Sequence, residues 1–428
     1  MAKPTTPSGT PGTPSVLRAM NDRAALDLLL ARGPLSRTEI GTLTGLSKPT
    51  ASQLLARLET AGLVRVTGTS EGGPGPNAQL YAIEPTAAYA AGLDVTPGSV
   101  RASVADLTGR TVGTYEVRTA GAGTGVEAGV EAGAGEHGRG GTAVRQVTEA
   151  LGGALRAAGL GLDDVRHTVL GTPGAFDPRT GELRYANHLP GWHSPTLLGE
   201  LAAALPMPVA HENDVNLVAI AEQRLGVARG HEDFVLLWNE EGLGAALVLG
   251  GRLHRGWTGG AGEVGFLPVP GTPLVRDVTR ANGGGFQDLA GSQALPVLAR
   301  ELGVPDLPEM PYVQATPLLL ARAADTTTGP LRQLLETYAT RVAIGLASLV
   351  SVLDPELVVL SGASLTAGGE PLRALIQAEL AELAASRPHL LLGDVREHPV
   401  LRGALESALA VTRDEVFDTS RGALSPRP

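Results

Sequence analysis

The chain has 428 residues, which is too long for one ordinary domain and indicates two or three. Its 43% of hydrophobic and 18% of charged residues are typical of globular proteins, and a net charge of −10 argues against a protein that coats nucleic acid over its whole surface. The sequence has no cysteine, which excludes disulfides, thiolate nucleophiles and cysteine-ligated zinc.

The first 15 residues are rich in Pro, Thr, Ser and Gly and predict a disordered tail. They hold one lysine and no apolar run, so they have the features of neither a signal peptide nor a transit peptide. Elsewhere no stretch approaches the roughly 20 uninterrupted apolar residues of a membrane helix. We therefore expect a cytoplasmic protein with no membrane partner.

Residues 16–83 predict a DNA-binding head. Residues 17–31 carry apolar side chains at helical spacing and precede Gly33-Pro34, which ends a helix. The segment Ser36–Glu39 has the form of a capping box and begins a second, short helix. The first part of the head is therefore expected to be two helices separated by a tight stop.

A third helix and two strands complete the predicted head. The turn at 44–46 contains a glycine, which suits a positive φ, and Ser47 supplies the N-cap of the third helix. Two short helices joined by such a turn are typical of a helix-turn-helix. Strands at 62–66 and 79–83, separated by a Gly/Pro-rich loop, predict a wing.

The solvent face of the third helix favours DNA over the alternative, a helical bundle without a DNA role. Its short polar and cationic side chains suit base edges and phosphates. Residues 16–85 hold seven basic and six acidic side chains, so tight binding is expected to need two heads on one operator. The predicted DNA-contacting residues are Ser47, Lys48, Thr50, Ser52, Gln53 and Arg57, together with Arg37 from the second helix.

The loop of the predicted wing contributes little to this surface. Residues 71–77 contain Glu71 and no arginine. We therefore expect sequence specificity to come from the third helix.

The remainder of the chain, residues 84–428, predicts an α/β body. Helical and strand patterns alternate after a hairpin at 90–107, which is typical of helices packed on sheets. Residues 120–141 are mostly Gly, Ala, Val and Glu and predict a flexible surface insertion.

Several motifs, in order along the body, resemble those of the ROK family (repressors, open reading frames and kinases). Gly33–Arg37 and Thr44–Thr50 resemble the head of the repressor branch of that family. The motifs of the body are Pro173-Gly174-Ala175-Phe176-Asp177, Leu189-Pro190-Gly191-Trp192, Glu212-Asn213-Asp214, Gly259–Gly265 and Asp354–Gly362.

This resemblance implies a winged helix-turn-helix followed by a two-lobed, actin-like ATPase fold, in a homodimer or homotetramer. It divides the body into a small lobe at 84–195, a large lobe at 196–390 and a return to the small lobe at 391–428. Members of the family phosphorylate sugars or sense them.

The glycine loops argue against a kinase. The resemblance implies that Asp214 stands at the place of the catalytic aspartate. However, the first phosphate loop reads Asp94-Val95-Thr96-Pro97-Gly98, without its glycine pair, and the second begins with Glu240-Glu241. Two carboxylates facing a polyphosphate repel it. We therefore expect no ATP cofactor, no enzyme activity and a vestigial base at Asp214; the alternative is an ATP-dependent sugar kinase with a fused DNA-binding head.

The zinc site of the family is also absent from the sequence. Phe266 stands where the family has its histidine ligand, and no cysteine follows. We therefore expect no bound metal.

The sugar pocket is partly retained. By resemblance, the predicted ligand-binding residues are Asn213, Asp214, Glu263, Asp288 and His188. Carboxylates and amides suit a polyol because each can engage two hydroxyl groups, whereas Phe266 makes the pocket more apolar. The prediction is a repressor of carbohydrate genes that binds operator DNA and a sugar-like effector; a body that serves only for dimerisation is a further alternative.

Overall fold

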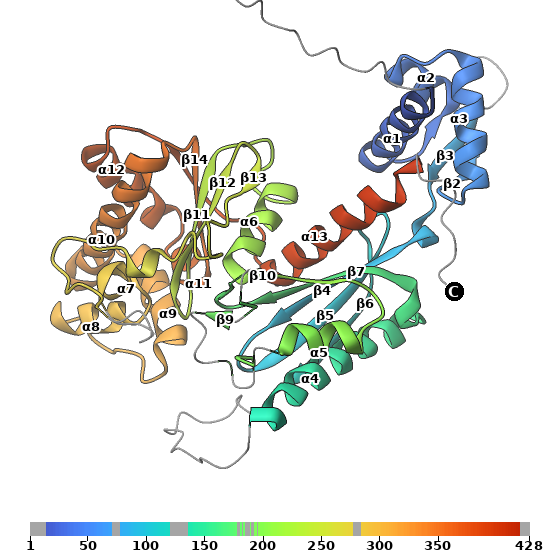
Figure 1. The fold of residues 1–428 in the computed structure, drawn as a ribbon. Helices are drawn as coiled ribbons and strands as arrows, with labels where there is room; N and C mark the ends of the chain where they lie inside the picture. Colours follow the sequence, from blue (N-terminus) through green and yellow to red (C-terminus); the bar gives the residue numbers. More distant parts are fainter. Residues whose placement is uncertain are drawn as a thin grey trace, which may run out of the picture.

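The computed structural model describes residues 14–70, 78–119, 136–177, 180–181, 183–184, 189, 192–194, 196–276 and 284–419. The chain forms a small N-terminal head and a larger body, and helix α13 (Pro399–Val416) runs from the body to the head (Figure 1). Within these ranges, no helix is long and apolar enough to cross a membrane.

The head is a three-helix unit with a three-stranded sheet of order β1-β3-β2. Buried aliphatic side chains from all three helices form its core, among them Leu26, Ile40 and Leu54. The elements are α1 (Pro14–Arg32), β1 (Leu35–Ser36), α2 (Arg37–Thr44), α3 (Lys48–Thr60), β2 (Val64–Thr69) and β3 (Gln79–Ile83). The loop predicted between the two wing strands lies largely outside the described residues.

Local capping interactions explain where the helices of the head begin and end. The Ser36 hydroxyl accepts a hydrogen bond from the Glu39 N–H, and the Glu39 carboxylate accepts one from the Ser36 N–H at 2.8 Å, so the predicted capping box is confirmed. Gly45 adopts a left-handed φ of 70° after α2, and Ser47 caps α3. The helix-turn-helix geometry therefore follows from local chemistry.

The first lobe of the body is built on a five-stranded sheet of order β10-β7-β4-β5-β6. Strands β4, β5 and β6 form an antiparallel meander, whereas β7 pairs in parallel with β4 and β10. Helices α4 and α5 pack against one face of this sheet. Its elements are β4 (Tyr89–Val95), β5 (Ser99–Asp106), β6 (Thr111–Arg118), α4 (Glu136–Ala158), β7 (Val165–Thr172), α5 (Leu197–Ala204) and β10 (Val209–Asn213).

The second lobe is built on a sheet of order β13-β12-β11-β14-β15. Its central strands are buried on both faces, one of which is covered by helices α7 to α10 and α12. Its strands are β11 (Phe234–Asn239), β12 (Leu243–Leu249), β13 (Arg252–Leu253), β14 (Leu357–Ser361) and β15 (His389–Leu392). Its helices are α7 (Gly285–Ala290), α8 (Ala294–Glu301), α9 (Tyr312–Ala324), α10 (Gly329–Leu353), α11 (Ala363–Ala367) and α12 (Gly369–Leu383).

Two helices lie between the sheets: α6 (Asp214–Arg224) and α13. Their side chains share one apolar cluster with residues from both sheets. The two helices cross very closely, because a Cβ added at Gly403 of α13 would lie 1.9 Å from the Leu217 carbonyl oxygen of α6. Only glycine permits this crossing without a shift of one helix.

The end of α13 is part of the head. Val416 and Phe417 are buried in the same apolar cluster as Leu26 and Ile40. The Arg23 guanidinium of α1 lies 5.5 Å from the centre of the Phe417 ring and pairs with Asp414 at 2.8 Å. The head is therefore attached to the body through the last turn of α13.

Two predicted boundaries differ from the structure. Residues 196–213 belong to the first lobe, because α5 packs with α4 and β10 extends the sheet beside β7. Residues 136–141, predicted as part of a flexible insertion, form the first turns of α4; the rest of that insertion, 120–135, lies outside the described residues.

Candidate DNA-reading surface and ligand site

The first turn of α3 presents the predicted DNA-contacting residues to solvent. Ser47, Lys48 and Thr50 are all exposed. The Ser47 and Thr50 hydroxyls share a hydrogen bond of 2.8 Å, which holds both side chains at the start of the helix. The Lys48 ammonium is therefore displayed next to two hydroxyl groups that suit phosphate oxygens.

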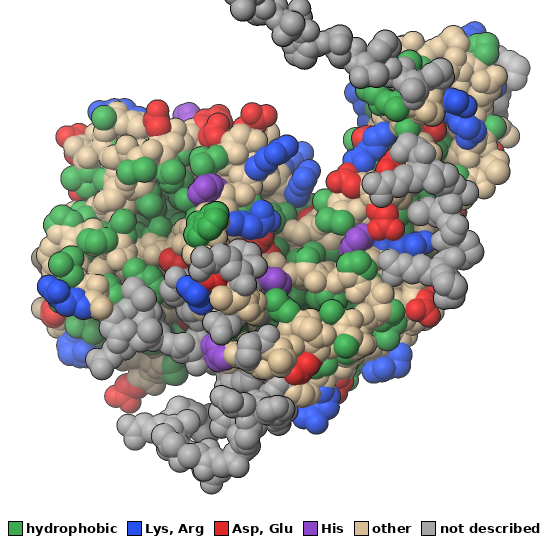
Figure 2. Space-filling view, in the orientation of Figure 1, with side chains coloured by type: hydrophobic (Ala, Val, Ile, Leu, Met, Phe, Trp, Pro, Cys, Tyr) green, Lys and Arg blue, Asp and Glu red, His purple; other side chains and the backbone are tan. Residues whose placement is uncertain are grey.

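A side-chain contact between α2 and α3 extends this surface. Arg37 at the start of α2 donates to the Ser52 hydroxyl at 3.1 Å, and Ser52 donates to the Lys48 carbonyl at 2.9 Å. Gln53 is exposed one residue further along α3. Lys and Arg side chains are visible on the part of the head that carries α3 (Figure 2). The structure thus links Arg37, Ser52 and Lys48 by hydrogen bonds and leaves Ser47, Thr50 and Gln53 exposed at the start of the same helix.

The Arg57 side chain pairs with helix α1. Its Nη2 donates to the Asp22 carboxylate of α1 at 2.6 Å, and the Asp22 side chain is only 5% exposed. Direct DNA contact by Arg57 has to use the guanidinium N–H groups that Asp22 does not engage. Its role at the operator stays a prediction.

Four carboxylates gather where the two lobes meet, and we call them the acidic cluster: Asp94, Asp214, Glu240 and Glu263. Asp94 lies near the end of β4, Asp214 begins α6, Glu240 follows β11 and Glu263 precedes a short turn of helix. Each is partly buried, so the cluster keeps some contact with solvent. Two strand ends and two helix starts from different lobes therefore contribute to one site.

Burial and mutual repulsion keep protons on the acidic cluster. Burial raises the pKa of Asp214 to about 8, and the charges of Asp94, Glu263 and Glu240 add to the rise. Burial likewise raises the pKa of Glu240 and of Glu263 to about 7, and that of Asp94 to about 6. Near neutral pH the cluster is therefore only partly ionised and offers both donors and acceptors of hydrogen bonds.

Glu240 occupies the place where a phosphate would be expected. Its carboxylate accepts a hydrogen bond of 3.3 Å from the Ala363 N–H, at the start of α11. Backbone N–H groups at a helix start are a common phosphate-binding element, and here a side-chain carboxylate already uses one. Asp94 adds a second carboxylate nearby, since its charge acts on Glu240. The residues present do not fit a nucleotide triphosphate.

Both polar atoms of the Asn213 side-chain amide form hydrogen bonds within the protein. Its oxygen accepts from the Asn216 N–H and caps α6, and its Nδ2 donates to the Gly174 carbonyl at 3.0 Å. Within the part of the chain that the structure describes, the neighbouring Asp214 accepts a hydrogen bond from the Val215 N–H at 2.8 Å and from no other group. Asp214, with Glu263, is therefore better placed for a ligand than Asn213.

Asp288, predicted as a ligand residue, does not join the acidic cluster in the structure. Asp288 lies on the exposed face of α7, whose buried face carries Phe286, Gln287 and Ala290. The prediction of Asp288 as a ligand residue is therefore not supported by its position. His188 lies outside the described residues.

The family's zinc does not fit this chain. Phe266 stands at the histidine position, and the whole sequence lacks cysteine. In the part of the chain that the structure describes, no group of three or more His, Asp or Glu residues is arranged to hold a metal ion.

Two members of the acidic cluster were missed as ligand residues from the sequence. Asp94 stands directly before the missing glycine pair of the first phosphate loop, and Glu240 replaces a glycine at the start of the second. A carboxylate in each of two loops that face the same pocket is the sequence signal for this cluster.

Comparisons with known proteins agree with the two-part architecture. The model of the ROK family matches residues 136–410, more than half of the chain, and that of the MarR family matches residues 21–73. A xylose repressor from Caldicellulosiruptor bescii is 24% identical over 82% of this chain and 84% of its own length. A glucokinase from Thermotoga maritima is 26% identical over 48% of this chain and 66% of its own length.

A solved structure of a ROK family transcriptional regulator, described as a homologue of the E. coli MLC protein, has the same fold. It superimposes with a TM-score of 0.70 at 18% identity, over 95% of this chain and all of that one. The predicted fold, a winged helix-turn-helix head on a sugar-kinase-like body, is confirmed. Because the family model covers most of the body, this chain belongs to the ROK family.

Proposed function

We propose that this protein is a DNA-binding transcriptional repressor of carbohydrate genes, whose body binds a sugar or a related polar metabolite. The observation that carries the proposal is the exposed first turn of α3, with Lys48 beside the Ser47 and Thr50 hydroxyls on a fully capped helix-turn-helix. The similarity to a xylose repressor along most of both chains supports it.

The acidic cluster suits an uncharged or cationic sugar. Carboxyl groups with a pKa between about 6 and about 8 can donate to and accept from neighbouring hydroxyls. A sugar phosphate would bring two negative charges towards the same groups. We therefore expect the effector to be a free sugar or an amino sugar, with sugar phosphates at least about tenfold weaker.

The route from ligand to DNA runs through two helices. Asp214 is the first residue of α6, α6 crosses α13 at Gly403, and the end of α13 lies in the core of the head. A ligand that draws the lobes together would therefore move α13 and the heads of a dimer, changing their fit to two half-sites.

An operator-binding titration tests the proposal. Fluorescence anisotropy of a labelled operator should show binding by the full chain, and a panel of free sugars should include one that weakens it. Glu263→Gln keeps the shape of the site and should shift the sugar dependence, whereas Asp288→Asn on the exposed face of α7 is the matched control. Absence of operator binding would contradict the proposal. Operator binding that no sugar changes would support the alternative in which the body serves only for dimerisation.

A sugar kinase is the second candidate, supported by the similarity to a glucokinase over about half of this chain. The contact between the Glu240 carboxylate and the Ala363 N–H at the start of α11 argues against a kinase. A coupled assay with ATP and the same sugars separates the two candidates: turnover above that of Asp214→Asn would establish a kinase.

A further inference from the structure

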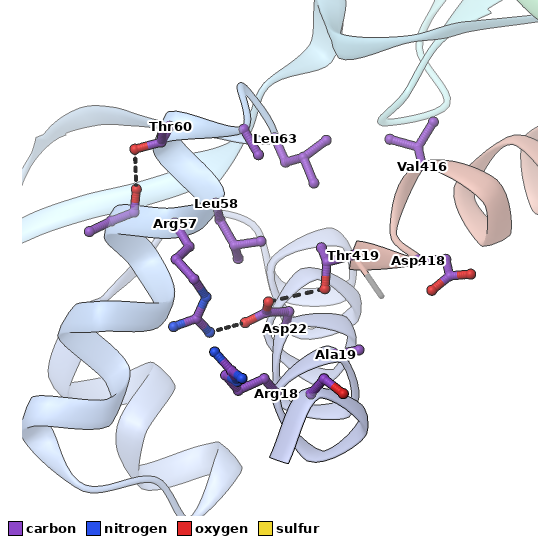
Figure 3. A pocket seen from close by; sticks show the side chains of 13 residues that line it. Arg18, Ala19, Asp22, Arg57, Leu58, Thr60, Leu63, Val416, Asp418 and Thr419 are labelled. Carbon is purple, nitrogen blue, oxygen red and sulfur yellow. Dashed lines mark hydrogen bonds and ion pairs between the residues drawn. The ribbon is translucent and has the colours of Figure 1, made fainter. Parts of the chain in front are cut away.

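A pocket lies between the head and the end of the body, far along α13 from the acidic cluster. Helices α1 and α3 form two of its walls, and the residues after α13 form the third (Figure 3). Its volume is about 590 Å³, within the range of small-molecule sites. No part of the function proposed above uses this pocket.

The floor and one wall of the pocket are apolar. Small side chains leave the space open there, and two leucines close it from the core of the head. The apolar residues are Ala19, Ala56, Leu58, Ala61, Leu63 and Val416. A ligand that fills this space needs an apolar body.

Charged arginine and aspartate side chains line the opposite wall of the pocket. Arg18 and Arg57 line the pocket, together with the carboxylates of Asp22 and Asp418 (Figure 3). Asp22 already accepts hydrogen bonds from Arg57 at 2.6 Å and from the Thr419 hydroxyl at 3.1 Å. The buried carboxylate is thus engaged by the protein, whereas Arg57 remains 41% exposed and has further N–H groups for an incoming acceptor.

We propose that this pocket binds a small organic acid, with its carboxylate on Arg57 and its apolar body against Ala56 and Leu63. The planar Arg57 guanidinium matches a carboxylate in both charge and geometry. The apolar part of the lining favours a ligand with an apolar body over a free sugar, and this site is separate from the acidic cluster.

The site would act directly on the head. A ligand there touches α3, α1 and the residues that follow α13, so it stabilises one arrangement of head and body. If Arg57 also contacts operator phosphates, which rests on the proposed function, ligand and DNA compete for it. Binding of the acid itself is independent of DNA.

Calorimetric titration of the full chain, without DNA, tests the proposal with 2-naphthoate and its uncharged analogue 2-naphthamide. The naphthoate should bind saturably, and the naphthamide about tenfold or more weakly, because it lacks the charge for Arg57. Arg57→Gln should lower the naphthoate affinity by a similar factor. Ala56→Leu should weaken both compounds, since it fills the pocket and leaves the Arg57–Asp22 pair intact.

The control is Arg65→Gln, which removes a guanidinium from strand β2 of the same head, outside the pocket. Its affinity for naphthoate should equal that of the parent. No saturable binding at millimolar naphthoate, equal binding of acid and amide, or insensitivity to both Arg57→Gln and Ala56→Leu would each overturn the proposal. Because DNA is absent, failure here is distinguishable from failure of operator binding.

Discussion

Substitution of Lys48 is the most direct single-residue test of DNA binding through α3. Lys48 stands at the first position of α3 and is exposed, and among the described residues its side chain forms no hydrogen bond or ion pair that would be lost on substitution. Lys48→Ala should weaken operator binding and lower the slope of log K against log salt by about 2 for two heads on one operator, because each head loses one phosphate contact.

The matched control for Lys48 is Arg300→Ala, which removes an exposed positive charge from α8 in the second lobe. It changes the net charge by the same amount without touching the head. Equal salt slopes for the parent and Lys48→Ala would show that Lys48 is not at a phosphate.

Asp214 predicts a pH dependence of stability. In the native chain burial raises its pKa to about 8 from a reference value of 3.8. Between these values the native state holds more protons than the unfolded state, so this carboxyl makes the free energy of unfolding fall as the pH rises. Asp214→Asn removes the contribution of this carboxyl and should raise the melting temperature above pH 8 relative to the parent, by about 1 °C for each kcal/mol gained.

Near pH 3 the two chains should melt alike, because Asp214 is then protonated in the native state and mostly protonated in the unfolded state. Melting curves across this range check the sign, with Asp288→Asn as the control on the exposed face of α7. A larger effect of Asp214→Asn at low pH than at high pH would contradict the buried, protonated carboxyl.

Single residues show where sequence reasoning reached its limit. The Ser36–Glu39 capping box involves residues three apart and was predicted correctly, because its geometry is local. The pairing of Arg57 with Asp22 joins residues 35 apart, and no local pattern reveals it. Asp288 matches the order of the family motifs, but its side chain lies on the exposed face of α7.

At the scale of elements, α13 is the connection on which both proposals depend. It packs on α6 and on the first-lobe sheet, and its end carries Phe417 into the head, where the ring is fully buried. Phe417→Ala should cost about 3–5 kcal/mol of local stability through the cavity it leaves. Hydrogen exchange should then lose protection in α1 while the second-lobe strands stay protected.

Val411→Ala is the control on the same helix, since Val411 is 48% exposed and deletion of its methyl groups leaves no cavity. Unchanged protection of α1 in Phe417→Ala would show that the head is held by other contacts. The strand and helix order of both lobes was predictable from alternating patterns, whereas the assignment of 196–213 to the first lobe needed the pairing of β10 with β7.

For the whole molecule, a small DNA-reading head sits on a body with a net negative charge. The seven basic and six acidic side chains of residues 16–85 leave the head almost neutral, so a single head is expected to bind operator DNA weakly. Two heads held by a dimer of the body would add their contacts on one operator, and the symmetry of that operator should match the dimer.

A genome-wide footprint of DNA sites bound by the full chain, beside Lys48→Ala, tests the central claim most directly. The account predicts discrete sites with two half-sites related by two-fold symmetry, next to genes for sugar uptake or metabolism, and their loss in Lys48→Ala. Sites without symmetry that persist in Lys48→Ala, or no enriched sites at all, would contradict a repressor that reads its operator through α3.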